Sequence, residues 1–87
     1  MEFFVDNDEG CFAWLAAHHE GFVVNCYRLP TASYLVLHRA PCHHIQRWEG
    51  RNSTRDYAKA CAETEQALHD WAATLGGTAT RCGSCQP

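Results

Sequence analysis

The chain has 87 residues, which suits one domain with a small and marginally stabilising hydrophobic core. Its net charge of -3 argues against attraction to nucleic acid through overall charge, and no apolar run is long enough to cross a membrane. The N-terminus lacks the basic segment and long apolar run of a secretory signal. We therefore expect a cytoplasmic protein.

The charges are distributed unevenly along the chain. Residues 1–27 carry five acidic residues and no Lys or Arg, whereas residues 28–59 carry six basic and two acidic residues. Two interpretations follow from this asymmetry. Either the basic segment forms a positive face, or the two parts of the chain neutralise each other across the fold.

The first half of the chain predicts a helix followed by a β-hairpin. Asp6, Asn7 and Asp8 are N-cap candidates for a helix over roughly residues 8–18, and Gly21 could close it in the left-handed conformation. Residues 22–27 and 34–38 are rich in β-forming residues and flank a turn that contains proline. They predict two paired strands, the second of which ends at His38.

The second half predicts a polar, basic loop over residues 43–56 and then a helix. From Tyr57 onward, mostly apolar residues three or four positions apart share one helical face, so a helix begins near Thr54 or near Glu63. A short third strand at residues 57–61 is the alternative.

The C-terminal region completes the expected fold. Gly76 and Gly77 close the helix, and residues 78–81 predict a last short strand. The expected fold class is α+β. Residues 1–87 would form one zinc-stapled domain: helix, β-hairpin, loop, helix and a C-terminal Cys-x2-Cys knuckle.

The cysteine spacing predicts a metal site. Cys82 and Cys85 form a Cys-x-x-Cys pair near the C-terminus, and His38 and Cys42 are four residues apart. In a reducing cytosol, such pairs bind metal or do redox chemistry more often than they form structural disulfides. A Cys3His set is one of the usual ligand sets of structural zinc, in which four protein ligands complete a tetrahedron. These four residues are therefore the predicted zinc ligands.

The remaining cysteines have simpler interpretations. Cys61 could replace His38 as the fourth ligand, or it could be a small core residue on an apolar helical face. Cys11 and Cys26 lie in apolar segments and are expected in the core. If the chain binds no metal, the alternative is that the cysteines are buried free thiols and that one closely spaced cysteine pair is incidental.

Two segments resemble a known zinc module. His38-Arg39-Ala40-Pro41-Cys42 and Arg81-Cys82-Gly83-Ser84-Cys85-Gln86-Pro87, with a helix between them, resemble the module of Ada-type DNA repair proteins over roughly residues 34–87. The resemblance is closer to relatives of that module appended to nucleases, which carry a His-x-x-x-Cys half and end in Cys-x-x-Cys-x-Pro. It implies the same four ligands, zinc, and DNA binding.

The resemblance does not extend to repair chemistry. In the Ada-type repair proteins, a zinc-bound cysteine accepts a methyl group from a phosphotriester, and His38 stands at the matching position. Residues 1–33 lie outside the module. Their segments Trp14-Leu15-x-x-His18 and Gly21-Phe22-Val23-Val24-Asn25 are similar to N-terminal segments of bacterial restriction or defence proteins with nuclease domains. That similarity implies a recognition module, solitary or cut from a larger enzyme.

The basic loop is the candidate nucleic-acid surface, because arginines bind phosphates and an indole stacks on bases. The alternative is that Trp48 covers the core and the arginines are simply solvated. His43 and His44 could be phosphate contacts, alternative ligands or solvated loop residues. The candidate nucleic-acid contacts are Arg39, His43, His44, Arg47, Trp48, Arg51 and Arg55.

The sequence favours a binding protein over an enzyme. No catalytic motif is present, and a complete metal shell leaves no position for an activated water. The leading hypothesis is a DNA-recognition module with a nuclease or another effector as partner. A zinc-stabilised protein-interaction adaptor is the alternative, and a redox or metal-delivery protein is a third possibility.

Overall fold

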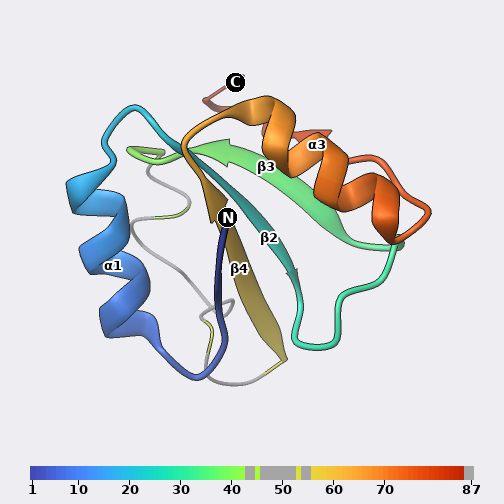
Figure 1. The fold of residues 1–87 in the computed structure, drawn as a ribbon, viewed down its shortest axis with the longest axis horizontal. Coiled ribbons are helices and arrows are strands. Elements are labelled where there is room, and N and C mark those ends of the chain that lie inside the picture. The colour runs from blue at the N-terminus through green and yellow to red at the C-terminus, as the bar shows by residue number, and fades with distance from the viewer. Residues whose placement is uncertain (43–44, 46–52, 54–55, 86–87) are drawn as a thin grey trace.

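The fold is α+β, as predicted: among the described residues, a five-stranded mixed sheet is accompanied by the helices α1 and α3 (Figure 1). The computed structural model describes residues 1–42, 45, 53 and 56–85. In chain order the elements are β1 (Glu2–Phe4), α1 (Asp8–Ala17), β2 (Phe22–Tyr27), β3 (Leu35–Arg39), β4 (Tyr57–Ala62), α3 (Glu65–Thr74) and β5 (Thr80–Arg81).

The strands are ordered β1-β4-β2-β3-β5 across the sheet. The predicted hairpin is confirmed, since β2 and β3 pair antiparallel with Phe22 opposite Arg39 and Cys26 opposite Leu35. The predicted C-terminal strand is confirmed as the short β5, which pairs parallel with β3. β1 was not predicted, because a three-residue strand carries almost no periodic signal.

The helix α1 begins where its capping residues predict. The Asn7 side chain accepts a hydrogen bond from the Gly10 amide at 2.9 Å. Gly21, however, does not adopt the left-handed conformation, so that expectation was wrong. A glycine is instead required there because a larger residue would clash. A Cβ would lie 2.9 Å from the Trp14 ring and 3.0 Å from the His18 carbonyl oxygen.

The predicted helical face from Tyr57 was wrong over its first part, and the alternative of a third strand was right. Residues 57–62 form β4, which pairs with both β1 and β2. Three alternating alanines of β4 leave room for α3 to approach the sheet. The helix itself starts after Thr64, whose hydroxyl accepts from the Ala67 amide at 3.2 Å. It closes at Gly76, which has a φ of 76°.

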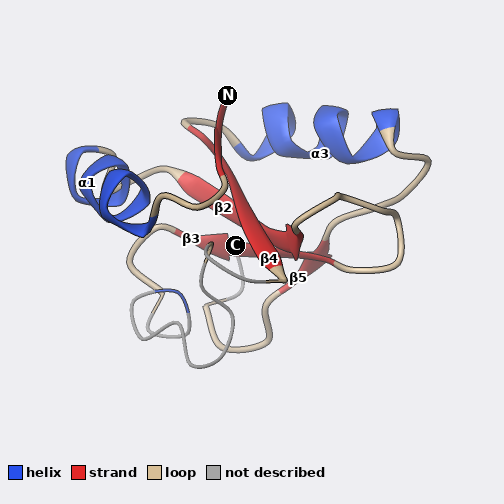
Figure 2. Cartoon of the chain, turned by 90° about the horizontal axis from the view of Figure 1, so that it is seen from below, coloured by secondary structure: helices blue, strands red, loops and turns tan. Residues whose placement is uncertain are grey.

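The sheet carries a separate hydrophobic cluster on each face. α3 lies along one face, as the edge-on view shows (Figure 2). The cluster under α3 consists of Val24, Cys26, Leu35, Leu37, Ala58, Ala60, Ala62, Leu68, Ala72 and Ala79. The opposite cluster, which we call the α1 face, consists of Cys11, Leu15, Val23, Ala40, Cys42, Ile45, Cys61 and Cys82.

Candidate metal centre

The sheet brings the four predicted ligands together. The parallel register of β3 and β5 sets Leu37 opposite Arg81, so the next residues, His38 and Cys82, lie at the same level. The Cys82 amide continues this pairing by donating to the Leu37 carbonyl at 2.8 Å. Cys42 is returned toward β3 by a tight turn, in which its amide donates to the Arg39 carbonyl at 3.0 Å.

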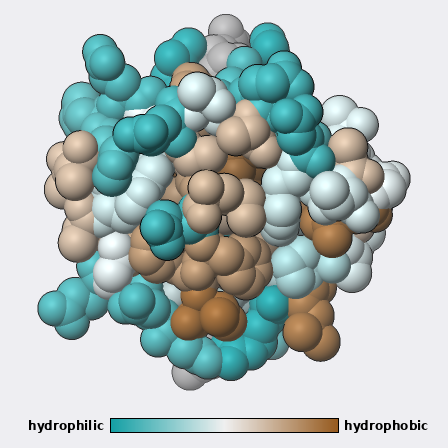
Figure 3. All heavy atoms as spheres, in the orientation of Figure 1, coloured by the Kyte–Doolittle hydropathy of each residue, from teal (hydrophilic) through white to brown (hydrophobic). Residues whose placement is uncertain are grey.

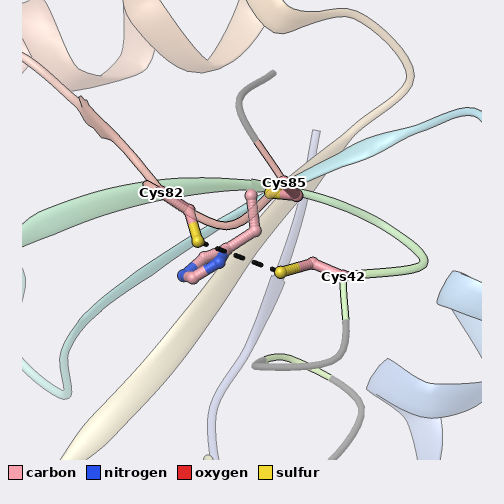
Figure 4. Close-up of side chains that lie close together, drawn as sticks. Cys42, Cys82 and Cys85 are labelled. Atoms are coloured by element: carbon pink, nitrogen blue, oxygen red, sulfur yellow. Dashed lines mark hydrogen bonds between the residues drawn. The ribbon is translucent and has the colours of Figure 1, made fainter.

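The ligand atoms have the spacing of a metal site. The nitrogen of His38 and the sulfurs of Cys42, Cys82 and Cys85 all lie within 4.8 Å of one another. The Cys42 and Cys82 sulfurs point toward each other and are 3.9 Å apart (Figure 4). Zn–S bonds of ~2.3 Å in a tetrahedron give a sulfur–sulfur edge of ~3.8 Å, whereas a disulfide is ~2.05 Å long. The separation therefore matches two ligands of one ion.

Backbone amides support two of the sulfurs. The Arg39 amide donates to the Cys85 sulfur at 3.3 Å, and the Ser84 amide donates to the Cys82 sulfur at 3.4 Å. The Arg39 side chain also holds the terminal turn, because its Nε donates to the Cys85 carbonyl at 3.2 Å. N–H donors of this kind stabilise negative charge on sulfur and orient it toward a metal.

Burial makes the centre a poor site for uncompensated charge. His38, Cys42 and Cys82 are buried, and Cys85 is half-buried. Burial raises the pKa of Cys85 to about 12, the Arg39 amide lowers it, and the neighbouring Cys42 raises it again. A bound cation would instead favour the thiolate form, because a coordinating thiol is deprotonated by the metal. The cluster can therefore hold a metal ion, which its three sulfurs and one nitrogen suit in number and chemistry.

The other three cysteines lie outside this centre. Cys61 is wholly buried on β4, and a hydrogen bond with Cys11, together with burial, raises its pKa. The group that could hold a metal ion contains His38 and not Cys61. Cys26 packs under α3, where burial raises its pKa to about 12. These three thiols belong to the core, as expected for Cys11 and Cys26.

Of the candidate nucleic-acid contacts, Arg39 is described, and it is exposed beside the metal centre. His43, His44, Arg47, Trp48, Arg51 and Arg55 lie outside the described residues. Two described residues of the same stretch are deeply buried: Ile45 packs on the α1 face, and Ser53 is held near α1. The Ser53 amide donates to Asp8 Oδ1 at 2.7 Å, and the Asn7 amide donates to the Ser53 hydroxyl at 3.2 Å.

Lys59, one of the six basic residues of segment 28–59, does not contribute to an exposed positive face. It is only 1% exposed, and its ammonium donates to Asn25 Oδ1. The other end of the Asn25 amide donates to the Tyr34 hydroxyl at 3.1 Å. Burial lowers the pKa of Lys59 to about 8. Sequence reasoning missed this polar chain, although the alternation of β4 would have turned Lys59 toward the same face as Cys61.

Comparison with known proteins adds no assignment. No family of proteins, no curated protein and no solved structure matches the chain. Within the part of the chain that the structure describes, no helix is long and apolar enough to cross a membrane.

Proposed function

We propose that the protein is a structural-zinc domain that recognises DNA. The observation that carries the proposal is the convergence of His38, Cys42, Cys82 and Cys85 within 4.8 Å. A Cys3His donor set that is largely removed from solvent is typical of structural zinc, and four protein ligands leave no position for an activated water. The proposed role is accordingly binding rather than catalysis.

The charge of the segment that follows Cys42, together with Arg39, supports DNA as the ligand. Arg39 is fixed to the knuckle through two contacts with Cys85. The chain that leaves Cys42 carries Arg47, Arg51 and Arg55, and Ile45 and Ser53 of the same stretch are buried. Zinc would thus hold one end of the segment whose arginines contact phosphate. The Ada-type resemblance agrees with this role and suggests a nuclease or another defence effector as partner.

A salt titration tests DNA binding directly. We expect the zinc-loaded chain to bind a labelled duplex, and the triple variant R47A/R51A/R55A to bind it more weakly, because phosphate contacts are lost. The slope of log affinity against log salt should flatten by about 1 for each lost contact. Arg81→Ala is the matched control, because Arg81 lies on β5 and faces Glu65 at 3.6 Å. Duplex affinity that the triple variant leaves unchanged would contradict the proposal.

A protein-interaction adaptor is the second candidate, favoured by apolar groups at the sheet edge. Met1, Phe3 and Val5 alternate along the N-terminal edge and are 59%, 38% and 37% exposed. The Phe3 ring contacts Trp71 of α3 at a centroid distance of 6.1 Å. Apolar residues gather on this side of the molecule, as the space-filling view shows (Figure 3). An adaptor predicts metal binding without any affinity for DNA.

A further inference from the structure

β1 is a strand at the edge of the sheet. Among the described residues it pairs with β4 alone, with Glu2 opposite Cys61 and Phe4 opposite Lys59. Glu2 and Phe3 are exposed, and β1 lies between α1 and α3 in both ribbon views (Figure 1, Figure 2). The outer side of an edge strand presents backbone N–H and C=O groups that another strand can bind. The β1 edge is therefore a candidate site for an added strand.

A cavity of about 250 Å³ lies beside the start of β1. Its lining includes Glu2 of β1, Trp14 of α1, His18 at the end of α1, Cys61 of β4, and Glu63, which follows β4. The cavity opens to solvent at Glu63, whose side chain is 79% exposed. Liquid water occupies ~30 Å³ per molecule, so the cavity has room for one long side chain and a few waters.

Strand alternation directs Glu2 toward this cavity. Phe4 packs against the α1-face cluster, and side chains two positions apart share a face of a strand, so Glu2 also lies on the α1 face. Phe3 lies on the other face, where its ring contacts Trp71. A residue paired with Glu2 on the outer side of β1 would share the α1 face. Its side chain would therefore lie at the cavity.

His18 and Glu63 present two hydrogen-bond acceptors to each other. His18 Nδ1 donates to the Trp14 carbonyl at 2.9 Å, and the His18 ring stacks on the Trp14 indole with a centroid distance of 4.1 Å. In a neutral imidazole this bond leaves Nε2 as an acceptor, and Nε2 faces Glu63 Oε1 at 3.7 Å. An ammonium or guanidinium group carries several N–H donors and can satisfy both atoms.

The charge of the cavity also favours a cation. Glu2 and Glu63 contribute two negative charges, and an α-amino group at Met1 would offset one of them, so the lining is net negative when His18 is neutral. Residues 1–27, which supply β1 and α1, carry five acidic residues and no Lys or Arg. The indole of Trp14 adds an aromatic surface that attracts cations. The same charge repels phosphate, so this edge is unsuited to DNA.

We propose that the β1 edge binds an extended basic segment of a partner protein by strand addition, with one Lys or Arg side chain in the cavity. Backbone pairing would supply affinity, and the cation would supply specificity. That cation would pair across the strands with Glu2 and donate to Glu63. A partner site of this kind goes beyond DNA recognition and does not depend on it.

An NMR titration of the isotope-labelled full chain tests the proposal. The probe is a capped peptide, Thr-Val-Thr-Arg-Thr-Val-Thr, whose β-branched residues favour an extended strand and whose centre carries the cation. We expect saturable shifts of the β1 amides and of the Trp14 indole N–H. The matched peptide with Gln in place of Arg should bind roughly 2- to 30-fold more weakly, because two charge pairs are lost.

Variants of the two carboxylates locate the cation. Glu2→Gln/Glu63→Gln keeps the size of both side chains. It should bind the Arg peptide roughly 2- to 30-fold more weakly than the wild type and lose the preference for Arg over Gln. Glu9→Gln/Asp70→Asn is the matched control, because it removes the same charge from exposed residues outside the cavity. The control should keep both the affinity and the preference.

Four results would overturn the proposal. The first is a wild-type chain whose β1 amides show no saturable shift at millimolar peptide. The second is equal affinity of the wild type for the Arg and Gln peptides. The third is a Glu2→Gln/Glu63→Gln variant that keeps its preference for Arg. The fourth is a shift of the β1 amides with protein concentration alone, which would identify a second copy of the chain as the occupant. None of these results bears on the duplex titration, so the proposed function would fail or stand separately.

Discussion

Lys59 is a buried residue whose charged form is opposed by its surroundings. Its ammonium is buried with Asn25 as acceptor, and the neighbouring groups that favour its charge are Cys11, Cys26, Asp8 and Cys61. Desolvation outweighs them, and the pKa falls from 10.5 to about 8. The unfolded chain therefore holds this proton more tightly than the folded chain, and protonation of Lys59 opposes folding.

This imbalance predicts a pH-dependent stability. Between pH 8 and pH 10.5 the unfolded state binds more protons at Lys59, so its contribution to stability rises with pH. The free energy of unfolding of the wild type relative to Lys59→Met should increase by about 1 kcal/mol from pH 7 to pH 9. Taking the difference between the two proteins cancels the opposite contribution of the buried thiols.

Urea denaturation at several pH values measures this difference. The pKa of Cys26 is raised to about 12, so its contribution is complete below pH 9 and is lost as the pH rises further. This loss is common to both proteins. A difference between wild type and Lys59→Met that stays constant from pH 7 to pH 9 would show that Lys59 keeps an ordinary pKa in the folded state.

At the scale of elements, the junction between α1 and β2 depends on a close approach. Gly21 follows the helix end, and its amide donates to the His18 carbonyl at 2.8 Å. A Cβ at this position would lie within 3.2 Å of Trp14, of the His18 carbonyl and of the Ala62 carbonyl. Two of these three contacts are with backbone, which cannot rotate away.

Gly21→Ala should therefore destabilise the fold by about 1–3 kcal/mol, the usual cost of overpacking. Thermal unfolding would measure the change. Gly83→Ala is the matched control, because nothing lies within 4 Å of a Cβ there. Equal unfolding temperatures for Gly21→Ala and the wild type would mean that the helix and strand separate easily at this junction.

Local signals explain which elements could be predicted from the sequence. The N-cap at Asn7, the hairpin and the glycine that ends α3 depend on residues close together in the chain, and all are present. The error from Tyr57 onward has a different cause. Tyr57 and Cys61 are spaced for a helical turn, yet they also share one face of a strand, and pairing with β1 and β2 decides between the two.

The candidate site was also predictable from the sequence only in part. The grouping of His38, Cys42, Cys82 and Cys85 was predictable because metal coordination requires specific residue types at specific spacings. The chain from Tyr34 through Asn25 to Lys59 was not, because it joins three strands that only the sheet brings together.

At the scale of the whole molecule, a metal ion in the candidate centre would join the C-terminal segment to the sheet. β5 has only two residues, and the Cys82 amide that follows it donates to Leu37 of β3. Such a short edge strand has little stability of its own. Four ligands from β3, the following turn and the C-terminal knuckle would supply the missing restraint, so that metal affinity becomes folding stability.

Native mass spectrometry with elemental analysis, on protein purified under reducing conditions, tests this central claim most directly. We predict one zinc per wild-type chain and none in Cys82→Ser/Cys85→Ser, which should also lose its cooperative unfolding transition. The control Cys11→Ala/Cys61→Ala removes two buried cysteines outside the centre and should keep its zinc. A wild-type chain without metal, or a Cys82→Ser/Cys85→Ser variant that retains zinc, would contradict the assignment of the centre.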